Sequence, residues 1–376
     1  MLFFKGQFSV QLTHAPIDQQ AKRGGKTLVE QVQEKCPTLA NPTRAFHVPS
    51  LFMSSGHLQT LYLSTRQSKP AGCPVNYKRE ILKFADGGKA AIDWSLPPQG
   101  VSPKDPLIVL ISGIGGGSYN YYVRSFAHLI GLPPYGYQVA VLHGRGCNGV
   151  KLATPKSFHS GMTEDLREFM KYLAQIKPDT PAVGVGFSLG ANILTKYVGE
   201  EGDKCPFVAA ISVCNPFDID ATLHSMSQPS FKNRYLYAAA LTRKLIKGFE
   251  ENKDVIIAGQ PELDPAQIVA SRTMNEFNES YAARAFGYNS AKELNVSGSS
   301  VNYLKDIRIP TLFINALNDP ICERSTIPHE LIAKNPHLLL ACTKYGGHLA
   351  YFKGLGLKPW LPEQLAQFVQ AMVEWK

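Results

Sequence analysis

Gly186-Phe187-Ser188-Leu189-Gly190 is the stretch of sequence that decides the fold of this chain. A short apolar run at residues 182–186 suits a buried strand, and residues 189–198 can form a helix. The quoted stretch spans the junction between the two. On a tight turn between strand and helix, the two glycines remove the side chains that would collide and leave the serine hydroxyl accessible. The pattern therefore predicts that Ser188 is a nucleophile, in preference to an incidental serine in a glycine-rich turn.

Short apolar runs like this one recur along the chain. They are too short for buried helices and are separated by amphipathic segments such as residues 162–176, which is typical of a parallel sheet covered on both faces. The turn at residues 86–88 (Asp-Gly-Gly) predicts an antiparallel hairpin at one edge. The sequence thus predicts an α/β fold with a mostly parallel, doubly wound sheet. Its eight strands are expected at residues 79–84, 90–96, 107–111, 139–142, 182–186, 207–213, 311–314 and 337–341.

The strand pattern divides the chain into three parts. Residues 1–75 lack periodicity and are rich in proline and glycine, so we expect an extension that wraps on the core or is partly mobile and carries no function. Residues 76–214 and 307–376 should form the core. Residues 215–306 interrupt the alternation and look mostly helical. Because this insertion is too large for a simple crossover, we predict a helical cap over the sheet, with a side layer as the alternative.

Composition restricts the class of protein. The 376 residues are 44% hydrophobic, and 39 Lys and Arg against 30 Asp and Glu give a net charge of +9. A basic surface can favour anionic lipid, but the sequence contains no run of five like charges, and no nucleic-acid partner is expected. The seven cysteines are odd in number and form no CxxC pair, so neither a disulfide framework nor a zinc site is predicted.

The beginning of the chain bears on its location. The apolar patch in residues 1–10 is interrupted by Lys5 and Gln7 and is too short for a signal peptide or a membrane span. We therefore expect an intracellular protein, either cytoplasmic or attached peripherally to a membrane or lipid-droplet surface.

A serine nucleophile needs a base, and reactive groups in an open parallel sheet gather at the carboxyl ends of the strands. His348 follows the last strand, whereas His337 precedes it and should lie at the opposite edge. In this kind of fold the usual chain order is nucleophile, acid, histidine, which selects His348 as the base. His128, His143 and His159 precede Ser188 in the chain and do not fit this order.

The acid that orients the base should follow a strand and precede the histidine. Asp319 follows the strand that ends near residue 314, whereas Asp306 lies before that strand. Asp319 would orient His348 and stabilise its protonated form. Asp218 and Asp220 follow an earlier strand and remain the rival candidates.

Two backbone N–H groups would stabilise a developing oxyanion. This fold supplies one from the residue after the nucleophile and one from the loop after an earlier strand, which are Leu189 and Ile114. The loop at residues 112–118 is glycine-rich, so backbone can approach a substrate closely. It lacks the lysine of a phosphate-binding loop and the third glycine of a dinucleotide-binding loop, and no cofactor or metal is predicted.

Several stretches are specific enough to point to a family. They are Gly56 to Leu61 (GHLQTL), Gly115 to Tyr119 (GGGSY), Arg145 to Gly149 (RGCNG), His159 to Leu166 (HSGMTEDL), Ser271 to Thr273 (SRT) and Phe286 to Tyr288 (FGY). With these, the chain from about residue 46 onwards resembles the AB hydrolase 4 family of the α/β-hydrolase superfamily.

The resemblance implies a carboxylic ester hydrolase with an α/β-hydrolase fold. Eukaryotic members act on lipid esters and include monoacylglycerol lipases, phospholipases and yeast medium-chain fatty acid ethyl ester synthase/esterases. The catalytic triad of the family falls on Ser188, Asp319 and His348. The chain departs from the family pattern at Ser112, where a histidine is common. It also lacks the acid that would complete the His-x4-Asp motif of acyltransferase relatives, since Lys353 stands there.

The predicted function is hydrolysis of lipid or medium-chain acyl esters, including acylglycerols, through an acyl-enzyme on Ser188. One alternative is alcohol O-acyltransfer, as in fatty acid ethyl ester synthesis, because an alcohol can attack an acyl-enzyme as water does. Phospholipase activity is another. A non-catalytic binding module on the same fold is the remote alternative, since fold alone does not prove activity.

Overall fold

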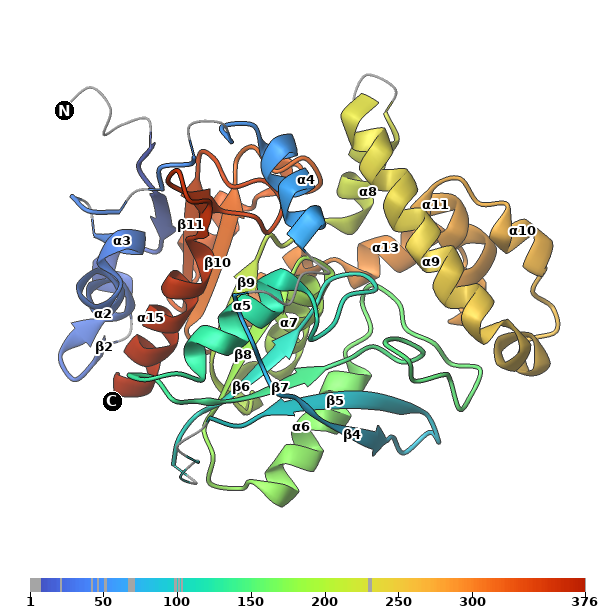
Figure 1. Ribbon diagram of the computed structural model, residues 1–376, viewed down its shortest axis with the longest axis horizontal. Helices are drawn as coiled ribbons and strands as arrows, with labels where there is room; N and C mark the ends of the chain where they lie inside the picture. The colour runs from blue at the N-terminus through green and yellow to red at the C-terminus, as the bar shows by residue number, and fades with distance from the viewer. Residues whose placement is uncertain are drawn as a thin grey trace.

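A nine-stranded sheet forms the centre of the molecule, and helices cover both of its faces (Figure 1). The computed structural model describes residues 8–375 except 21, 42, 46, 51–52, 67–71, 98–99, 101, 103 and 229–231. Six parallel strands make up the middle of the sheet, in the spatial order β11 (Leu338–Thr343), β10 (Thr311–Ala316), β9 (Phe207–Val213), β8 (Ala182–Phe187), β6 (Leu107–Ile111) and β7 (Gln138–Leu142).

The strand register aligns the carboxyl ends of the central strands. Ile111 of β6 pairs with Gly186 of β8, and Val213 of β9 pairs with both Phe187 and Ile314. The loops that follow β6, β8, β9, β10 and β11 therefore start at one edge of the sheet, which is where an open parallel sheet binds its ligands.

Antiparallel strands complete the sheet on both sides. The predicted hairpin is present as β4 (Lys78–Lys83) and β5 (Lys89–Ser95), with β5 next to β7. At the other edge, β1 (Gln11–His14) pairs antiparallel with β11. The eight predicted strands are all present and β1 is an additional ninth. Its four residues, Gln-Leu-Thr-His, are too short and too polar to give a strand signal.

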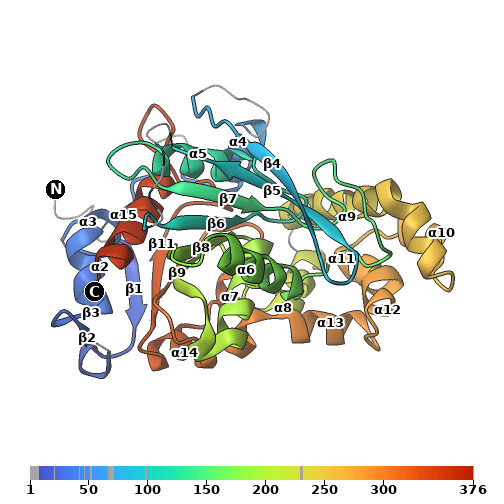
Figure 2. The same ribbon diagram turned by 90° about the horizontal axis from the view of Figure 1, so that it is seen from below.

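The two faces of the sheet are covered by different helices (Figure 2). One face carries α5 (Tyr121–Ile130) and α15 (Leu361–Glu374), and the other carries α6 (Glu164–Ile176), α7 (Leu189–Glu201) and α14 (His329–Lys334). Alternate residues of β6 supply the two cores, with Ile108 and Leu110 in one apolar cluster and Val109 in the other. Each fully buried side chain of this kind contributes about 1.5–3 kcal/mol, so the doubly covered sheet dominates stability.

The described residues of the N-terminal extension pack on the core. Its helix α2 begins with a capping box between Thr27 and Glu30, and Gln31 Nε2 donates to the carbonyl of Ala371 in α15 at 3.0 Å. Its elements after β1 are η1 (Ile17–Gln19), β2 (Lys22–Arg23), β3 (Lys26–Thr27), α2 (Leu28–Lys35), α3 (Pro37–Ala40) and α4 (Gly56–Arg66).

Helices fill the segment between β9 and β10, at the right of Figure 1. One long helix spans residues 232–259, and the helix that starts at residue 265 is followed by a separate one because Thr273 caps a new helix. The elements are α8 (Ile219–Ser227), α9 (Lys232–Gly259), α10 (Pro265–Val269), α11 (Met274–Phe277), η3 (Asn278–Ala282), α12 (Ala283–Ala285), α13 (Ala291–Gly298) and η4 (Ser300–Asp306). They pack around an apolar cluster of their own that includes Phe249, Ile256 and Ile268.

Short elements connect the rest of the chain. These are η2 (Gly202–Lys204), η5 (Arg324–Thr326), β12 (Phe352–Lys353) and β13 (Lys358–Pro359). Among the residues that the structure describes, no helix is both long and apolar enough to cross a bilayer.

Close packing between α7 and η4 gives a test of how the helical segment is anchored. A Cβ on Gly199 of α7 would lie 2.5 Å from the carbonyl oxygen of Tyr303, whereas Gly248 of α9 has open space around its Cα. We expect Gly199→Ala to lower the free energy of unfolding by about 1–3 kcal/mol through overpacking. The matched control Gly248→Ala should raise it by up to about 1 kcal/mol through helix propensity. Urea denaturation of both variants measures the difference, and equal effects would contradict the close packing.

Candidate active site

The turn between β8 and α7 has the geometry that the Gly-x-Ser-x-Gly pattern predicts. Ser188 adopts φ 55° and ψ −119°, a backbone conformation that L-residues rarely take. A Cβ on Gly186 would lie 2.4 Å from the carbonyl oxygen of Gly190, and a Cβ on Gly190 would lie 2.3 Å from that of Ile111. Both positions therefore require glycine. The backbone N–H of Ser188 donates to the carbonyl of Val213 at 2.8 Å, which fixes the turn to β9.

The structure brings together the three residues predicted for the triad. His348 Nε2 lies 2.8 Å from Ser188 Oγ, and His348 Nδ1 lies 2.8 Å from Asp319 Oδ2. A carboxylate only accepts hydrogen bonds, so the imidazole donates from Nδ1 and its Nε2 accepts the serine hydroxyl. His348 and Asp319 are 8% and 5% exposed, so this chain of hydrogen bonds is shielded from water. The arrangement can remove the hydroxyl proton of Ser188.

Backbone groups fix the orientation of Asp319. Its Oδ1 accepts hydrogen bonds from the N–H groups of Ile321 at 2.8 Å and Cys322 at 3.0 Å. Both bonds go to the oxygen that His348 does not use, so the carboxylate cannot rotate without losing them.

The rival acids have other roles. Asp218 caps α8 by accepting from the N–H of Ala221 at 2.9 Å, and Asp220 accepts from Asn295 at 3.5 Å. No hydrogen bond or ion pair in the described part of the chain joins either carboxylate to His348. His337 precedes β11, at the edge of the sheet away from Ser188, as its place in the sequence predicted.

The two predicted oxyanion donors lie beside the nucleophile. Ile114 and Leu189 both line the cavity that contains Ser188, and no residue that the structure describes accepts a hydrogen bond from either N–H. The Ile114 loop is held in place by Asn148, whose Nδ2 donates to the carbonyl of Gly116 at 2.8 Å. These N–H groups are thus available to a substrate, and their role in binding an oxyanion stays a prediction.

A buried network behind this loop was not predicted from the sequence. Asp93 Oδ2 accepts from Ser118 Oγ at 2.5 Å, from His143 Nε2 at 2.8 Å and from Arg79 at 2.8 Å. Burial alone would raise the pKa of Asp93, but these hydrogen bonds outweigh it and hold the pKa well below its usual range. The only sign of this network in the sequence is the acidic residue Asp93 within the apolar run of β5.

An apolar cavity of about 230 Å³ opens from Ser188 toward the helical segment. Its walls away from the triad come mainly from α8, α9 and α11, and their apolar side chains are Ile219, Leu223, Met226, Leu241, Leu245, Met274 and Phe277. His159 also lines the cavity, and burial lowers its pKa to about 4, so this side chain is neutral. The lining suits a hydrocarbon chain attached to a reacting carbonyl.

The described part of the N-terminal extension contacts the candidate site, although no function was expected there. Thr60 of α4 accepts a hydrogen bond at its Oγ1 from the backbone N–H of His348 at 2.9 Å. Gln59 Oε1 accepts from the N–H of Phe352 at 3.0 Å. A Cβ on Gly56 would lie 1.9 Å from the carbonyl oxygen of Asn318, next to the acid. Helix α4 therefore contacts the loops that carry both His348 and Asp319.

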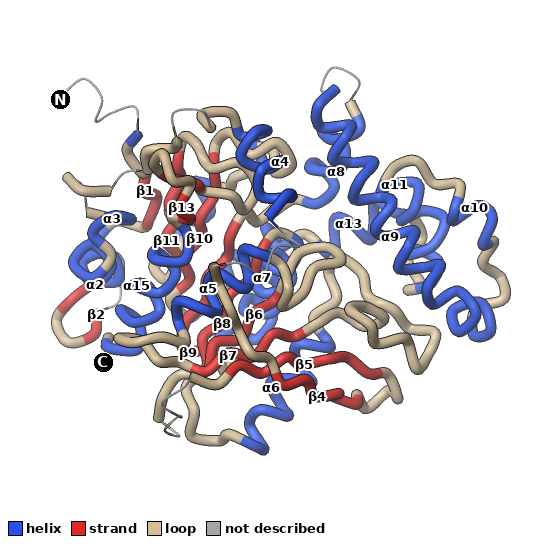
Figure 3. The backbone as a smooth tube through the Cα atoms, in the orientation of Figure 1, coloured by secondary structure: helices blue, strands red, loops and turns tan. Residues whose placement is uncertain are grey.

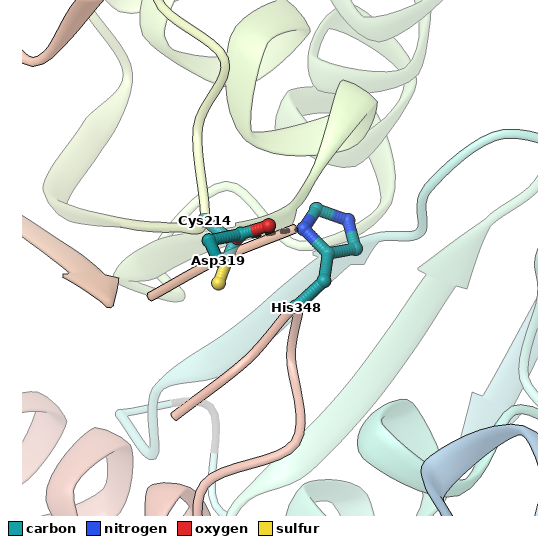
Figure 4. A group of neighbouring side chains, drawn as sticks. All are labelled: Cys214, Asp319 and His348. Atoms are coloured by element: carbon teal, nitrogen blue, oxygen red, sulfur yellow. Dashed lines mark hydrogen bonds and ion pairs between the residues drawn. The ribbon is translucent and has the colours of Figure 1, made fainter. Parts of the chain in front are cut away.

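A thiol lies next to the acid and the base (Figure 4). Donor atoms of Cys214, Asp319 and His348 lie within 4.8 Å of one another, a spacing that could suit a metal ion. The Asp319 and His348 atoms are bonded to each other, and the thiol accepts from the N–H of Leu349 at 3.3 Å. Burial raises the pKa of Cys214 well above its usual range, so the thiolate that a metal requires is disfavoured. These residues fit a proton-transfer site better than a metal site.

The contact of α4 with His348 can be tested at Thr60. Thr60→Val keeps the volume but removes the acceptor and leaves a buried N–H unpaired, at a cost of about 1–3 kcal/mol. We expect kcat for an ester substrate to fall about tenfold with little change in KM, because the base is displaced while the apolar cavity is intact. Thr60→Ser, which retains the acceptor oxygen, should restore most of the rate. Full kcat in Thr60→Val would show that the hydrogen bond does not position His348.

The sequence of this chain is similar to a family model and to several known proteins. A family model described as alpha/beta hydrolase fold matches residues 106–255. The medium-chain fatty acid ethyl ester synthase/esterase 2 of Saccharomyces cerevisiae is 31% identical over 397 residues, covering 88% of this chain and 86% of that protein. The monoacylglycerol lipase of Saccharomyces cerevisiae is 30% identical, with 92% and 84% covered. Phospholipase ABHD3 of Mus musculus is 29% identical, with 93% and 84% covered.

A solved structure supports the fold. The Pyrococcus furiosus esterase Pf2001 superposes with a TM-score of 0.50 at 14% identity, covering 81% of this chain and 92% of that one. At this identity the likeness concerns the arrangement of the sheet and its helices alone.

Proposed function

Because the chain belongs to the alpha/beta hydrolase fold family, we propose that it is a serine carboxylic ester hydrolase acting on lipid or medium-chain acyl esters through Ser188, His348 and Asp319. The observation that carries the proposal is the hydrogen-bonded chain from Ser188 through His348 to Asp319, at the wall of an apolar cavity. Acylglycerols and other acyl esters are the proposed substrates, in keeping with the activities named for the yeast relatives.

The reaction begins with attack of Ser188 Oγ on the ester carbonyl. As the C–O bond forms, His348 Nε2 takes the hydroxyl proton, and Asp319 stabilises the resulting imidazolium through Nδ1. The carbonyl oxygen gains negative charge, which the N–H groups of Ile114 and Leu189 stabilise. When the tetrahedral intermediate collapses, the bond to the leaving alcohol breaks, and His348 gives its proton to that alcohol.

The second half of the reaction releases the acid. Water enters next to the acyl-enzyme, His348 removes one of its protons, and the remaining hydroxide attacks the acyl carbon. The bond to Ser188 Oγ then breaks, and His348 returns the proton to the serine. One ester and one water yield one alcohol and one carboxylic acid, and the enzyme is unchanged.

The helical segment at residues 215–306 is proposed to act as a cap. Side chains of α8, α9 and α11 line the cavity opposite Ser188, and the apolar residues Leu223, Met226 and Phe277 would contact the acyl chain. A cap made of these residues excludes water from the oxyanion and strengthens its electrostatic stabilisation.

We also propose that the protein works inside the cell, in the cytoplasm or attached peripherally to a membrane or lipid-droplet surface. The net charge of +9 supports attraction to anionic lipid, and the exposed Leu58 and Leu61 of α4 lie on the helix that also lines the cavity.

Replacement of the nucleophile tests the proposed function directly. Ser188→Ala should lower kcat for a medium-chain monoacylglycerol by on the order of 10⁴-fold or more, because the acyl-enzyme cannot form. Circular dichroism and the thermal midpoint should remain close to those of the wild-type protein. A fluorophosphonate probe should label the wild-type protein and fail to label the variant. Retained turnover in Ser188→Ala would exclude Ser188 as the nucleophile. A wild-type protein that resists the probe and hydrolyses no ester would instead favour the non-catalytic binding module.

Product analysis decides between hydrolysis and alcohol transfer. Lys353 stands five residues after His348, at the acid position of the His-x4-Asp motif, and its Nζ pairs with Glu363 at 2.6 Å. The acid of the acyltransferase motif is therefore missing. We expect mainly free fatty acid when an octanoyl ester is turned over in the presence of ethanol, with ethyl ester as a minor product. Gas chromatography quantifies both. Ethyl ester in excess over free acid at modest ethanol concentration would identify the protein as a transferase.

A further inference from the structure

A second, larger cavity adjoins the catalytic one. It has a volume of about 690 Å³ and lies between α9 and the loop at residues 145–158. The two cavities share lining residues, including Ile114, Phe158 and Lys244. They therefore meet at the predicted oxyanion donor, where the scissile carbonyl of an ester would be held.

The two cavities differ in chemistry. The catalytic cavity is walled by apolar side chains of α8, α9 and α11, which suits an acyl chain. The second cavity also has apolar lining, such as Phe249 and Ile256, but it adds polar side chains, among them Asn148, Ser157 and Asn252. An ester has an apolar acyl part on one side of its carbonyl and an alcohol on the other. The second cavity thus matches the alcohol part of the substrate.

Most charged groups that line the second cavity are already paired. Arg145 contacts Asp86 and Asp165 at 2.7 Å each, so two carboxylates neutralise its charge. Lys247 lies 3.7 Å from Glu251, one turn further along α9. These groups leave no excess charge for a ligand.

Lys244 is the exception among the charged residues described around this cavity. No ion pair or hydrogen bond to a described residue involves its ammonium group, and its side chain passes beside Gly115, next to the oxyanion loop. Partial burial lowers the pKa of Lys244, with no carboxylate nearby to raise it. An ammonium that has lost part of its hydration without gaining a counter-charge is stabilised by binding an anion.

We propose that the second cavity receives the alcohol part of the ester and that Lys244 binds a phosphate carried by that alcohol. The substrate class would then include acyl esters of glycerol phosphate, which are split into a fatty acid and a glycerol phosphate. This inference rests on the proposed ester hydrolase function and adds the residue that selects the head group.

Paired substrates with the same acyl chain test the proposal. We would measure kcat/KM for 1-octanoylglycerol, which is neutral, and for 1-octanoylglycerol 3-phosphate, which is anionic, with wild-type protein, Lys244→Gln and Lys247→Gln. The ratio of anionic to neutral kcat/KM should fall about tenfold or more in Lys244→Gln, the value of one charge-assisted hydrogen bond. Lys247→Gln removes a lysine from the same helix and cavity, but Lys247 is paired with Glu251. In this variant the ratio of anionic to neutral kcat/KM should stay within twofold of wild type. Lys244→Arg should retain most of the ratio.

Several outcomes would overturn the proposal. An equal fall in both glutamine variants would indicate general electrostatic attraction to the basic surface, and no fall in either would exclude Lys244. Glycerol 3-phosphate should inhibit the wild-type protein more strongly than Lys244→Gln. If inorganic phosphate inhibits the wild-type protein as strongly as glycerol 3-phosphate does, the site binds free phosphate and not a head group. Wild-type protein that cleaves the neutral ester alone contradicts this inference, whereas protein that cleaves neither ester contradicts the proposed function.

Discussion

The contact between Gly190 and the end of β6 is the constraint on which the site depends. There is no room for a side chain, since a Cβ would lie 2.3 Å from the carbonyl oxygen of Ile111, so α7 starts directly at the edge of the sheet. The chain can make this turn only if Ser188 adopts a positive φ, and that conformation directs the hydroxyl away from the helix. The loops after β6, β10 and β11 start at the same edge. The loop after β11 places His348 against that hydroxyl, the loop after β10 places Asp319 against His348, and the loop after β6 places Ile114 in the same cavity.

The loop that carries the base is also strained and is supported from several directions. Leu349 and Tyr351 both have positive φ values, which cost of order 1–3 kcal/mol each unless surrounding contacts maintain them. The N–H of Leu349 donates to Cys214, and that of Phe352 donates to Gln59 of α4. In the proposed reaction, a histidine held in this way would have little freedom to reorient during proton transfer, which is the condition for efficient general-base catalysis.

Much of this arrangement could be predicted from the sequence because it follows from chain order and strand ends. Strand position alone separated His348 from His337 and Asp319 from Asp306, since only one of each pair follows its strand. The hydrogen bond of Thr60 was not predicted, because its partner lies 288 residues away. The only sign in the sequence is that Thr60 lies in the stretch Gly56 to Leu61, which resembles the family. Lys244 was not predicted either, because its distinguishing property is the absence of a nearby carboxylate in the described fold. β1 was missed because its pairing with β11, and not its composition, makes it a strand.

The pairing of β1 with β11 also has a consequence for how the protein is made. Thr13 of β1 lies opposite Leu340, so β1 has no partner in the sheet until β11 has been synthesised. The same is true of α4, which waits for the loop around His348. Contacts of such long sequence separation form late and slow the completion of folding. A nascent chain that has already exposed Ser188 therefore still lacks His348, and the proposed triad forms only after the loop behind β11 has been synthesised.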